Sequence, residues 1–528
     1  MKSLLITTVL FFGLCGIYIL LMLAGTEGHY TYIIDDAYIH LSIAKNFALH
    51  QVWGMTPYAF SSSSSAPLFT FLLSVFISLF GNHELIPLFF NAVCSFLIIH
   101  FLYQYYSIFF KNNKHRIIAS LFTVFFAVLH LQLLIGMEHA LHVLVVIVNV
   151  LYLYQWMNSG FKDRFSLYWF YFSIALLGLI RFESMFYFVS LVLLFFVIKR
   201  YQEIFLTLLF GFVPILLFGC YNYQQAGYFF PNSVVVKGTQ FDFSGNYFEQ
   251  IYIILFKNML FNVSFYKVGL FPLLMTAVLL IKEYKNKKRF SEIVSDYFFV
   301  IVWSLTLILH SLFGDFKGTF RYEAYIMVGF TMALIPKLKN FFAQPFIQFK
   351  KDKVSGILIL CSFLLLIYKT GYAHKMLVLG SRNIYEQQVQ SAKFLNRYYN
   401  TSKVVANDIG AICYFSEIHL FDIAGLGSKE MIPFNQNKRV FDDEFENYLE
   451  NYCEKNKYQL AVVYESWLGN HVPENWKKAA VLQINNKIGV ASDRVTIFSI
   501  DPDIHDQLKQ NIKNFNWNKN VKVEIAEE

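Results

Sequence analysis

Long apolar runs alternate with short polar connectors over the first 373 residues of this 528-residue chain. About eleven of these runs are long enough to cross a bilayer as helices. We expect spans at 4–24, 85–110, 117–136, 139–158, 166–182, 183–199, 202–221, 262–281, 296–313, 323–337 and 354–372. The pattern predicts a polytopic α-helical membrane protein.

Two further apolar segments, 37–50 and 67–80, lie in the first connector and are short for a span. We expect each to form a re-entrant or interfacial helix. The five serines at 61–65 stand between them and are typical of a plain linker.

The pattern changes after residue 373. Short β-type runs, KVVAND from Lys403, YQLAVVYE from Tyr458 and RVTIFSI from Arg494, alternate with helical stretches. A segment of about 150 residues can bury a core of its own. We therefore divide the chain into a membrane module, 1–373, and a soluble α/β domain, 374–528.

The composition supports this class, with 56% hydrophobic and only 15% charged residues. The net charge of +8 resides in alternate connectors, such as KEYKNKKR from Lys282. By the positive-inside rule these connectors and the N-terminus are cytoplasmic, so an odd number of spans exports the α/β domain from the plasma or inner membrane. No nucleic-acid partner is expected.

Cysteine usage leaves one question open. Four of the six cysteines lie in apolar runs and are typical of small buried side chains. Cys413 and Cys453 fall in the exported domain, where a disulfide and two free thiols are both compatible with the sequence.

Two adjacent carboxylates, Asp35 and Asp36, follow the first span on its outer side. One aspartate is enough to cap the helix predicted after them. Charges at membrane level are costly and mark functional sites, and a carboxylate there can take the proton of a hydroxyl that attacks an anomeric carbon. We favour the catalytic interpretation of the pair.

Several local patterns then occur in order along the chain: DDAYIHLSIAKNFA from Asp35, SAPLFTFLLSVFISLFG from Ser65, GMEHALH from Gly136, RFE from Arg181, YFFPNSVVVKG from Tyr228, FRYEAYIMV from Phe320 and NDIGAICYFSEIHLFDIAGL from Asn407. With this topology the chain resembles the GT-C superfamily of polytopic glycosyltransferases, which use polyprenyl-phosphate sugars. The nearest resemblance is to the branch of the mycobacterial terminal arabinofuranosyltransferase. Lipid A aminoarabinose transferases and protein O-mannosyltransferases are more distantly similar.

The resemblance implies an inverting transfer of a sugar from a polyprenyl-phosphate donor to an extracytoplasmic envelope glycan, glycolipid or protein. Asp35 or Asp36 would be the catalytic base, and the other would orient a sugar hydroxyl or hold the geometry. Two carboxylates without a third acidic or histidine-rich partner nearby give weak support for a metal cage. We expect no cofactor; a divalent metal at this pair is the less favoured alternative.

Three cations on the outer side are candidates for binding the lipid phosphate. Arg321 is the first choice because arginine makes bidentate phosphate contacts, and Lys237 and Arg181 follow. Each also has a structural interpretation. Arg181 and Arg321 could pair with neighbouring carboxylates, and Lys237 could be a solvated loop residue.

Three polar residues complete the candidates for substrate binding. Glu138 is a membrane-level carboxylate in one of the resembling patterns. Asn232 could shape its loop or bond a sugar hydroxyl, and loop shaping is the safer interpretation. Asp408 follows a β-type run, where it either shapes a turn or lines an acceptor groove.

Two other functions compete with a transferase. A transporter or flippase for lipid-linked sugars would show charged or broken helices near mid-bilayer and two similar halves, and neither is visible in the sequence. A non-catalytic envelope assembly protein would make the two aspartates dispensable.

Overall fold

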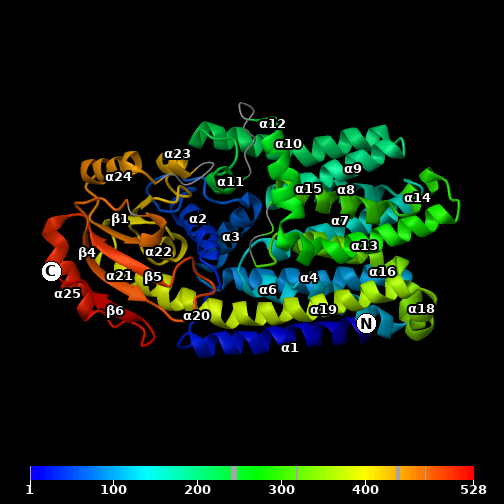
Figure 1. Ribbon diagram of the computed structural model, residues 1–528, viewed down its shortest axis with the longest axis horizontal. Helices are drawn as coiled ribbons and strands as arrows, with labels where there is room; N and C mark the ends of the chain where they lie inside the picture. Colours follow the sequence, from blue (N-terminus) through cyan, green and yellow to red (C-terminus); the bar gives the residue numbers. More distant parts are fainter. Residues whose placement is uncertain are drawn as a thin grey trace.

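The computed structural model describes residues 2–238, 246–314, 316, 319–435, 441–469 and 471–527. A bundle of long helices carries a sheet domain at one end, and the N-terminus lies at the other end (Figure 1). The chain is therefore an integral membrane protein with a C-terminal sheet domain, as the apolar pattern predicts.

Among the described residues, six helices are long and apolar enough to span a membrane: α1 (Lys2–Gly25), α4 (Ile86–Phe109), α7 (His139–Asn158), α10 (Tyr201–Ala226), α13 (Val263–Lys285) and α19 (Lys353–Lys375) with its continuation. A seventh candidate is the pair α14 (Phe290–Asp296) and α15 (Phe298–Phe313), bent by 83°. Shorter apolar helices are α3 (Pro67–Phe80), α8 (Arg164–Ile180), α9 (Ser184–Val197) and α16 (Ala324–Lys337). The count of about eleven spans stays a prediction.

The run expected at 117–136 is not one helix. It divides into α5 (Asn113–Phe126) and α6 (Leu129–Leu134). Val128 between them has φ 53°, a left-handed conformation that is strained for a β-branched residue. Its side chain is buried, so packing rather than local preference sets this break.

Short helices occupy the connectors. They are α2 (Asp36–His50), α11 (Asn232–Lys237), α12 (Tyr247–Tyr252), the π-helical η1 (Ile253–Leu260), α17 (Lys339–Ala343) and α18 (Pro345–Lys351).

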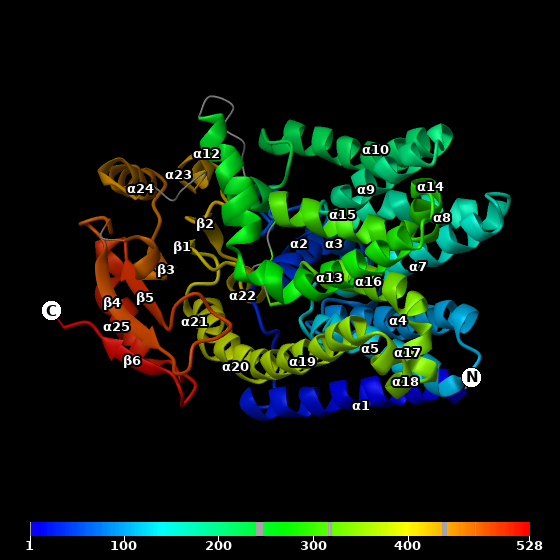
Figure 2. The same cartoon turned by 45° about the vertical axis from the view of Figure 1, so that its right-hand side comes forward.

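One long helix joins the two modules. α19 continues through η2 (Met376–Gly380), α20 (Ser381–Ile384), η3 (Tyr385–Val389) and α21 (Gln390–Tyr398), and Figure 2 shows it running from the bundle to the sheet. The boundary expected at 373/374 falls inside this helix. Its two π-helical segments interrupt the regular turn, a feature frequent at functional sites.

The C-terminal domain is built on a six-stranded sheet of order β2-β1-β3-β5-β4-β6. Its strands are β1 (Lys403–Ala406), β2 (His419–Asp422), β3 (Leu460–Val463), β4 (Lys477–Gln483), β5 (Arg494–Ser499) and β6 (Lys522–Ile525). β1 is parallel to β2 and β3, whereas the other pairs are antiparallel. The three β-type runs of the sequence are confirmed as β1, β3 and β5.

Helices and single turns complete this domain: α22 (Gly410–Phe415), α23 (Ile432–Asn435), α24 (Asp443–Lys455), α25 (His505–Asn514), η4 (Lys429–Met431), η5 (Glu465–Trp467) and η6 (Pro502–Ile504). Cys413 on α22 and Cys453 on α24 are both free and buried, in two separate hydrophobic clusters. Of the two alternatives, the structure has free thiols.

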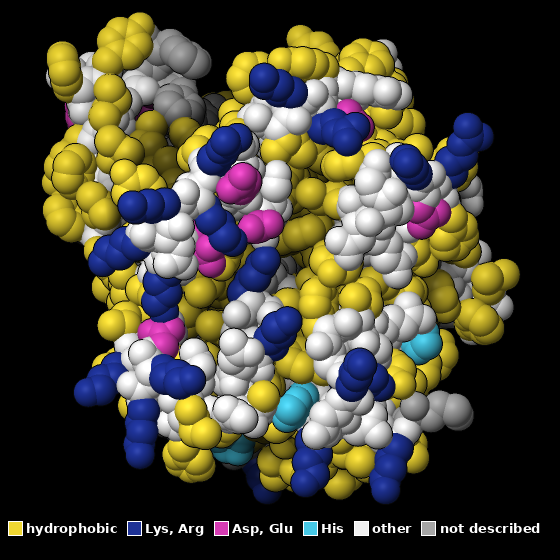
Figure 3. Space-filling view, turned by 90° about the vertical axis from the view of Figure 1, so that its right-hand side faces the viewer, with side chains coloured by type: hydrophobic (Ala, Val, Ile, Leu, Met, Phe, Trp, Pro, Cys, Tyr) yellow, Lys and Arg dark blue, Asp and Glu magenta, His cyan; other side chains and the backbone are white. Residues whose placement is uncertain are grey.

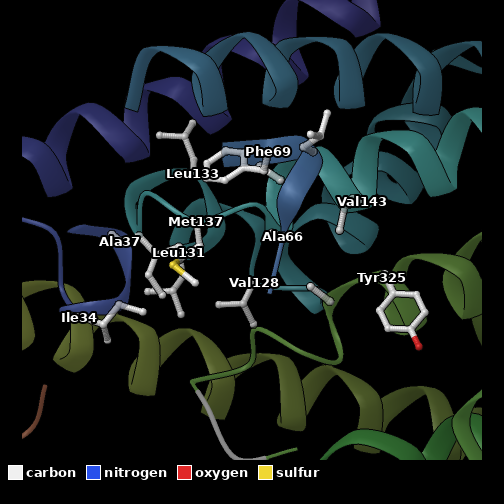
Figure 4. Packing of buried hydrophobic residues seen from close by; sticks show 14 of the residues in the cluster. Ile34, Ala37, Ala66, Phe69, Val128, Leu131, Leu133, Met137, Val143 and Tyr325 are labelled. Atoms are coloured by element: carbon white, nitrogen blue, oxygen red, sulfur yellow. The ribbon is translucent and has the colours of Figure 1, made fainter. Parts of the chain in front are cut away.

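The aspartate pair is held in place by the core around it. Ile34 and Ala37, on either side of the pair, are buried and lie beside Leu131 of α6 and Met137, which precedes α7 (Figure 4). Close packing fixes the start of α2 relative to the bundle.

Close contact between α15 and α16 gives a test of the packing. A Cβ on Gly329 would lie 2.0 Å from the ring of the fully buried Trp303, which stacks on Tyr187 at 4.7 Å. We predict that Gly329→Ala lowers the thermal unfolding temperature of the purified protein, at a cost of about 1–3 kcal/mol for overpacking. Gly371→Ala is the control, because nothing lies within 4 Å of a Cβ there. Equal unfolding temperatures for the two variants would contradict this packing.

Candidate active site

Asp35 and Lys45 join α2 to α22 of the C-terminal domain. The Asp35 carboxylate makes no cap for its own helix and instead accepts hydrogen bonds from the backbone N–H groups of Gly410 and Ala411, the latter at 2.8 Å. At the other end, Lys45 Nζ donates to the carbonyl oxygen of Tyr414 at 2.8 Å. A carboxylate at the N-terminus and an ammonium at the C-terminus of α22 both match its dipole.

This contact explains a glycine in the pattern after β1. A Cβ on Gly410 would lie 2.2 Å from the backbone oxygen of Asp35. Only glycine allows the two backbones to approach this closely. α2 is consequently enclosed, with Ala37 to Asn46 all buried, and its re-entrant or interfacial placement stays a prediction.

Asp408 meets Asp35 at the carboxyl end of the parallel strands. It follows β1, and Tyr464 follows the adjacent β3, so both side chains reach the same sheet edge. Asp408 Oδ2 accepts hydrogen bonds at 2.8 Å from Tyr464 Oη and from Gln388 Nε2, which projects from η3. Burial and the charge of Asp35 hold the pKa of Asp408 well above its usual range. The pKa of Asp35 is also raised by burial, but less than that of Asp408, so Asp408 is the group of the two that favours the proton.

Asp36 has a different environment. Its side chain is 31% exposed, whereas Asp35 is 6% exposed, and its Oδ2 lies 3.0 Å from Arg321 Nη1. Burial alone would raise the pKa of Asp36, but the charges of Lys237 and Arg321 hold it below its ordinary value. Lys237 itself is exposed at the end of α11. Asp36 is therefore an accessible, ionised carboxylate between two cations.

A second charged group lies behind Arg321. The ring of Tyr322 is 5.3 Å from the Arg321 guanidinium and 4.9 Å from that of Arg181. Arg181 Nη1 lies 2.6 Å from Glu138 Oε1, and its Nε donates to Glu183 at 3.0 Å. Two carboxylates thus neutralise Arg181, and the ion pair with Glu183 that the sequence suggested is present.

His40 connects this group to α2. It lies one turn after Asp36, and its Nε2 is 3.3 Å from Glu138 Oε2. Its Nδ1 is 2.8 Å from Thr70 Oγ1 and 3.2 Å from Ser64 Oγ. The ring is therefore fixed on both sides.

The serine run is part of the site and is not a plain linker. Ser61 to Ser64 are buried, and Ser63 Oγ donates to the carbonyl oxygen of Leu426 at 2.7 Å. Small hydroxyl side chains fit where two backbones pack closely and still satisfy buried polar groups. Composition alone could not distinguish this from a solvated linker.

Asn232 shapes the loop that carries Lys237. Its Nδ2 donates to the carbonyl oxygen of Leu426 at 3.1 Å, and its N–H donates to that of Ser62 at 2.8 Å. Its Oδ1 is buried without a hydrogen-bond partner among the described residues. These contacts tie the α11 loop to the serine run and to the C-terminal domain.

The eight residues proposed from the sequence fall into three groups. Asp36 pairs with Arg321 and is acted on by the charge of Lys237, and Glu138 and Arg181 form the ion pair behind Tyr322. Asp35, Asp408 and Asn232 join the two modules. The sequence analysis missed His40, Tyr322, Gln388 and Tyr464. Only His40, at i+4 from Asp36, and Tyr322, next to Arg321, carried a local signal.

The part of the chain that the structure describes contains one group of three side chains with metal-ligand spacing, Asp443, Glu446 and His471. It lies in the C-terminal domain, and Asp443 is 95% exposed.

Comparisons with known proteins found one family profile and several solved structures. A family profile described as "Domain of unknown function (DUF8728)" matches residues 382–498, and no curated protein matches the sequence. ArnT from Cupriavidus metallidurans bound to undecaprenyl phosphate is 12% identical with a TM-score of 0.51, covering 94% of this chain and 98% of that one. Its apo structure is 11% identical with a TM-score of 0.50 over the same shares of both chains.

The archaeal oligosaccharyltransferase AglB from Archaeoglobus fulgidus, in complex with an inhibitory peptide and a dolichol-phosphate, is 10% identical with a TM-score of 0.43, covering 97% of this chain and 75% of that one. At these identities the likeness to ArnT shows a shared fold alone, so the predicted helical membrane module with a C-terminal α/β domain is confirmed. The arabinofuranosyltransferase branch stays a prediction.

The role of Asp35 can be tested by hydrogen exchange. In Asp35→Asn the backbone amides of Gly410 and Ala411 lose a charged acceptor worth about 1.5–3 kcal/mol per bond. We predict at least about tenfold faster exchange for the peptide that contains both amides. Asp36→Asn is the matched control because Asp36 pairs with Arg321 and makes no hydrogen bond with α22 among the described residues. Unchanged exchange in Asp35→Asn would show that the carboxylate does not hold α22.

The protonated state of Asp408 has a consequence for stability against pH. Because its pKa is raised in the folded protein, the stability it contributes is complete below the ordinary pKa near 3.8 and is lost as pH rises through the raised value. Asn mimics the protonated carboxyl, so we predict that Asp408→Asn unfolds at a higher temperature than wild type at neutral pH. The difference should shrink toward pH 4. The exposed Asp503→Asn serves as control, and a difference independent of pH would exclude a protonated Asp408.

Proposed function

We propose that the protein transfers a sugar from a polyprenyl-phosphate donor to a hydroxyl of an extracytoplasmic envelope glycan, glycolipid or protein. The observation that carries this proposal is the accessible Asp36 carboxylate, 3.0 Å from Arg321 and facing Lys237, where the helix bundle meets the C-terminal domain. One acid flanked by two cations suits a reaction that must accept a proton and release a phosphate anion.

In the proposed reaction the acceptor hydroxyl attacks the anomeric carbon of the donor sugar. A new carbon–oxygen bond forms, the bond between that carbon and the phosphate oxygen breaks, and the electron pair leaves with the polyprenyl phosphate. Asp36 takes the hydroxyl proton, while Arg321 and Lys237 stabilise the phosphate.

Donor binding would also raise the pKa of the base, Asp36. Arg321 holds the pKa of Asp36 low while the two are paired. A donor phosphate competes for the same guanidinium, and a weaker Asp36–Arg321 pair makes Asp36 a stronger base. The carboxylate is thus activated only when substrate is present.

The other polar residues act as positioning residues in this proposal. Glu138 and Glu183 neutralise Arg181, which supports Arg321 through the shared contact with Tyr322. Asp35 is engaged with α22 and is too buried to reach an acceptor. The C-terminal domain then covers the site and provides one wall for the acceptor.

One comparison supports the donor class. ArnT, which shares the fold, was solved with undecaprenyl phosphate, the product that such a donor would leave.

The site also has its own positive charge. Arg321 and Lys237 already supply the positive charge that a metal would otherwise provide. We therefore propose a reaction without a divalent metal, and addition of EDTA to isolated membranes should leave transfer unchanged.

The test is sugar incorporation into envelope material in cells that lack the protein, complemented at matched membrane levels. We predict that Asp36→Asn loses about 10²–10⁴-fold of the transfer rate because the base is removed. Asp35→Asn should lose less, through displacement of α22. The exposed Asp443→Asn is the control.

The two aspartate variants separate the alternatives. Full incorporation in Asp36→Asn would exclude it as the base and favour a flippase or an assembly protein. Asp35→Asn could instead lose more of the transfer rate than Asp36→Asn while the α22 amides exchange hydrogen equally fast in both variants. That result would assign the base to Asp35.

A further inference from the structure

An apolar cavity of about 440 Å³ lies within the membrane module, away from the aspartates. It is enclosed by α5, α13, α16, α17, α18 and α19. Its walls are almost wholly apolar, and Phe122, Met275, Leu334, Phe342 and Ile359 contribute from different elements. A space with this lining suits a hydrocarbon chain.

The cavity is remote from the proposed site of chemistry. Arg321 comes just before α16, whereas the cavity is lined by residues from Phe330 to Leu338 of that helix and its end. At 1.5 Å per residue, Leu334 lies about 20 Å further along the bundle than Arg321. A phosphate held by Arg321 and Lys237 is therefore at the other end of the membrane module.

Four exposed cations lie close in the chain to residues that line the cavity. Lys339, Lys350, Lys351 and Lys353 are exposed, and none has an ion-pair partner among the described residues. They adjoin the lining residues Leu338, Phe349 and Gly356 in the chain. Figure 3 shows this end of the molecule, where Lys and Arg side chains are numerous.

Neighbouring lysines on the same face behave differently. Lys282 pairs with Asp352, and Lys288 pairs with Glu283 at 2.8 Å. The positive-inside rule accounts for the sign of the charge on this face. The four lysines differ from other exposed lysines of this face, such as Lys285 and Lys287, because they lie next to or within three residues of cavity-lining residues in the chain.

The segment that closes the cavity has an apolar outer side. Phe346 is 85% exposed and Ile347 is 51% exposed, directly before Lys350 and Lys351 on α18. Apolar side chains beside lysines on a short surface helix are typical of a segment that lies in the headgroup region of a bilayer.

We propose that the cavity binds an acyl chain of an anionic glycerophospholipid from the cytoplasmic leaflet, with its phosphate held by Lys339, Lys350, Lys351 and Lys353. Basic pockets between membrane helices on the cytoplasmic side recognise such headgroups. The isoprenoid tail of the donor fits this site less well, because its phosphate is needed at Arg321 and would leave the four lysines without an anion.

Native mass spectrometry of the purified full-length protein tests this directly. Wild type is exchanged into phosphatidylglycerol or into phosphatidylcholine with the same acyl chains, and retained lipid is measured. We expect phosphatidylglycerol to be retained at least about tenfold better. The variant with all four lysines changed to Gln should lose this preference. Lys285→Gln with Lys287→Gln, two exposed lysines that are not close in the chain to any lining residue, should keep it.

A second variant separates the cavity from the surface charge. Ile359→Trp fills the cavity and should reduce retention of both lipids, with thermal unfolding measured alongside. If Ile359→Trp does not fold, the lysine variants still test the proposal, because all their changes are on exposed side chains. Equal retention of the two lipids by wild type would overturn the proposal. The proposal would also be overturned if wild type retained added undecaprenyl phosphate and Arg321→Gln abolished that retention, because the cavity would then hold the donor tail.

Discussion

The attachment of α22 to α2 is the interaction on which the candidate site depends. One helix of the membrane module presents a carboxylate to the N-terminus and an ammonium to the C-terminus of a short helix in the other module. Both charges are buried, so each needs its partner, and separation of the modules would leave them unpaired. The sheet edge must meet α2 in one fixed position for these contacts to form. The continuous helix from α19 to α21, which both modules share, suits that requirement.

This attachment gives two chemically identical neighbours different roles. Asp35 is committed to the α22 amides and to Asp408, whereas Asp36 turns toward Arg321 and solvent. The side chains of successive residues at the start of a helix point about 100° apart. The two aspartates therefore cannot both reach α22 or both reach Arg321. A pair of carboxylates in a sequence therefore need not act as a pair in the site.

The two ends of the membrane module differ in how their charges are used. At the end that meets the C-terminal domain, Glu138, Glu183 and Asp36 neutralise the arginines inside the protein. At the opposite end, the exposed Lys339, Lys350, Lys351 and Lys353 have no ion-pair partner among the described residues. Buried charges require internal partners, while exposed ones can be matched by lipid or solvent.

The sequence by itself determined the class of the protein, most helices of the membrane module, three strands of the sheet and the choice of the Asp35–Asp36 segment as a candidate site. Those features depend on hydrophobic period and on the cost of charge near a membrane, which are local. The break at Val128, the burial of the serines and the division of roles between the aspartates were decided by tertiary structure. Their physical cause is contact between residues hundreds of positions apart, such as Asp35 with Ala411 and Ser63 with Leu426, which no local pattern encodes.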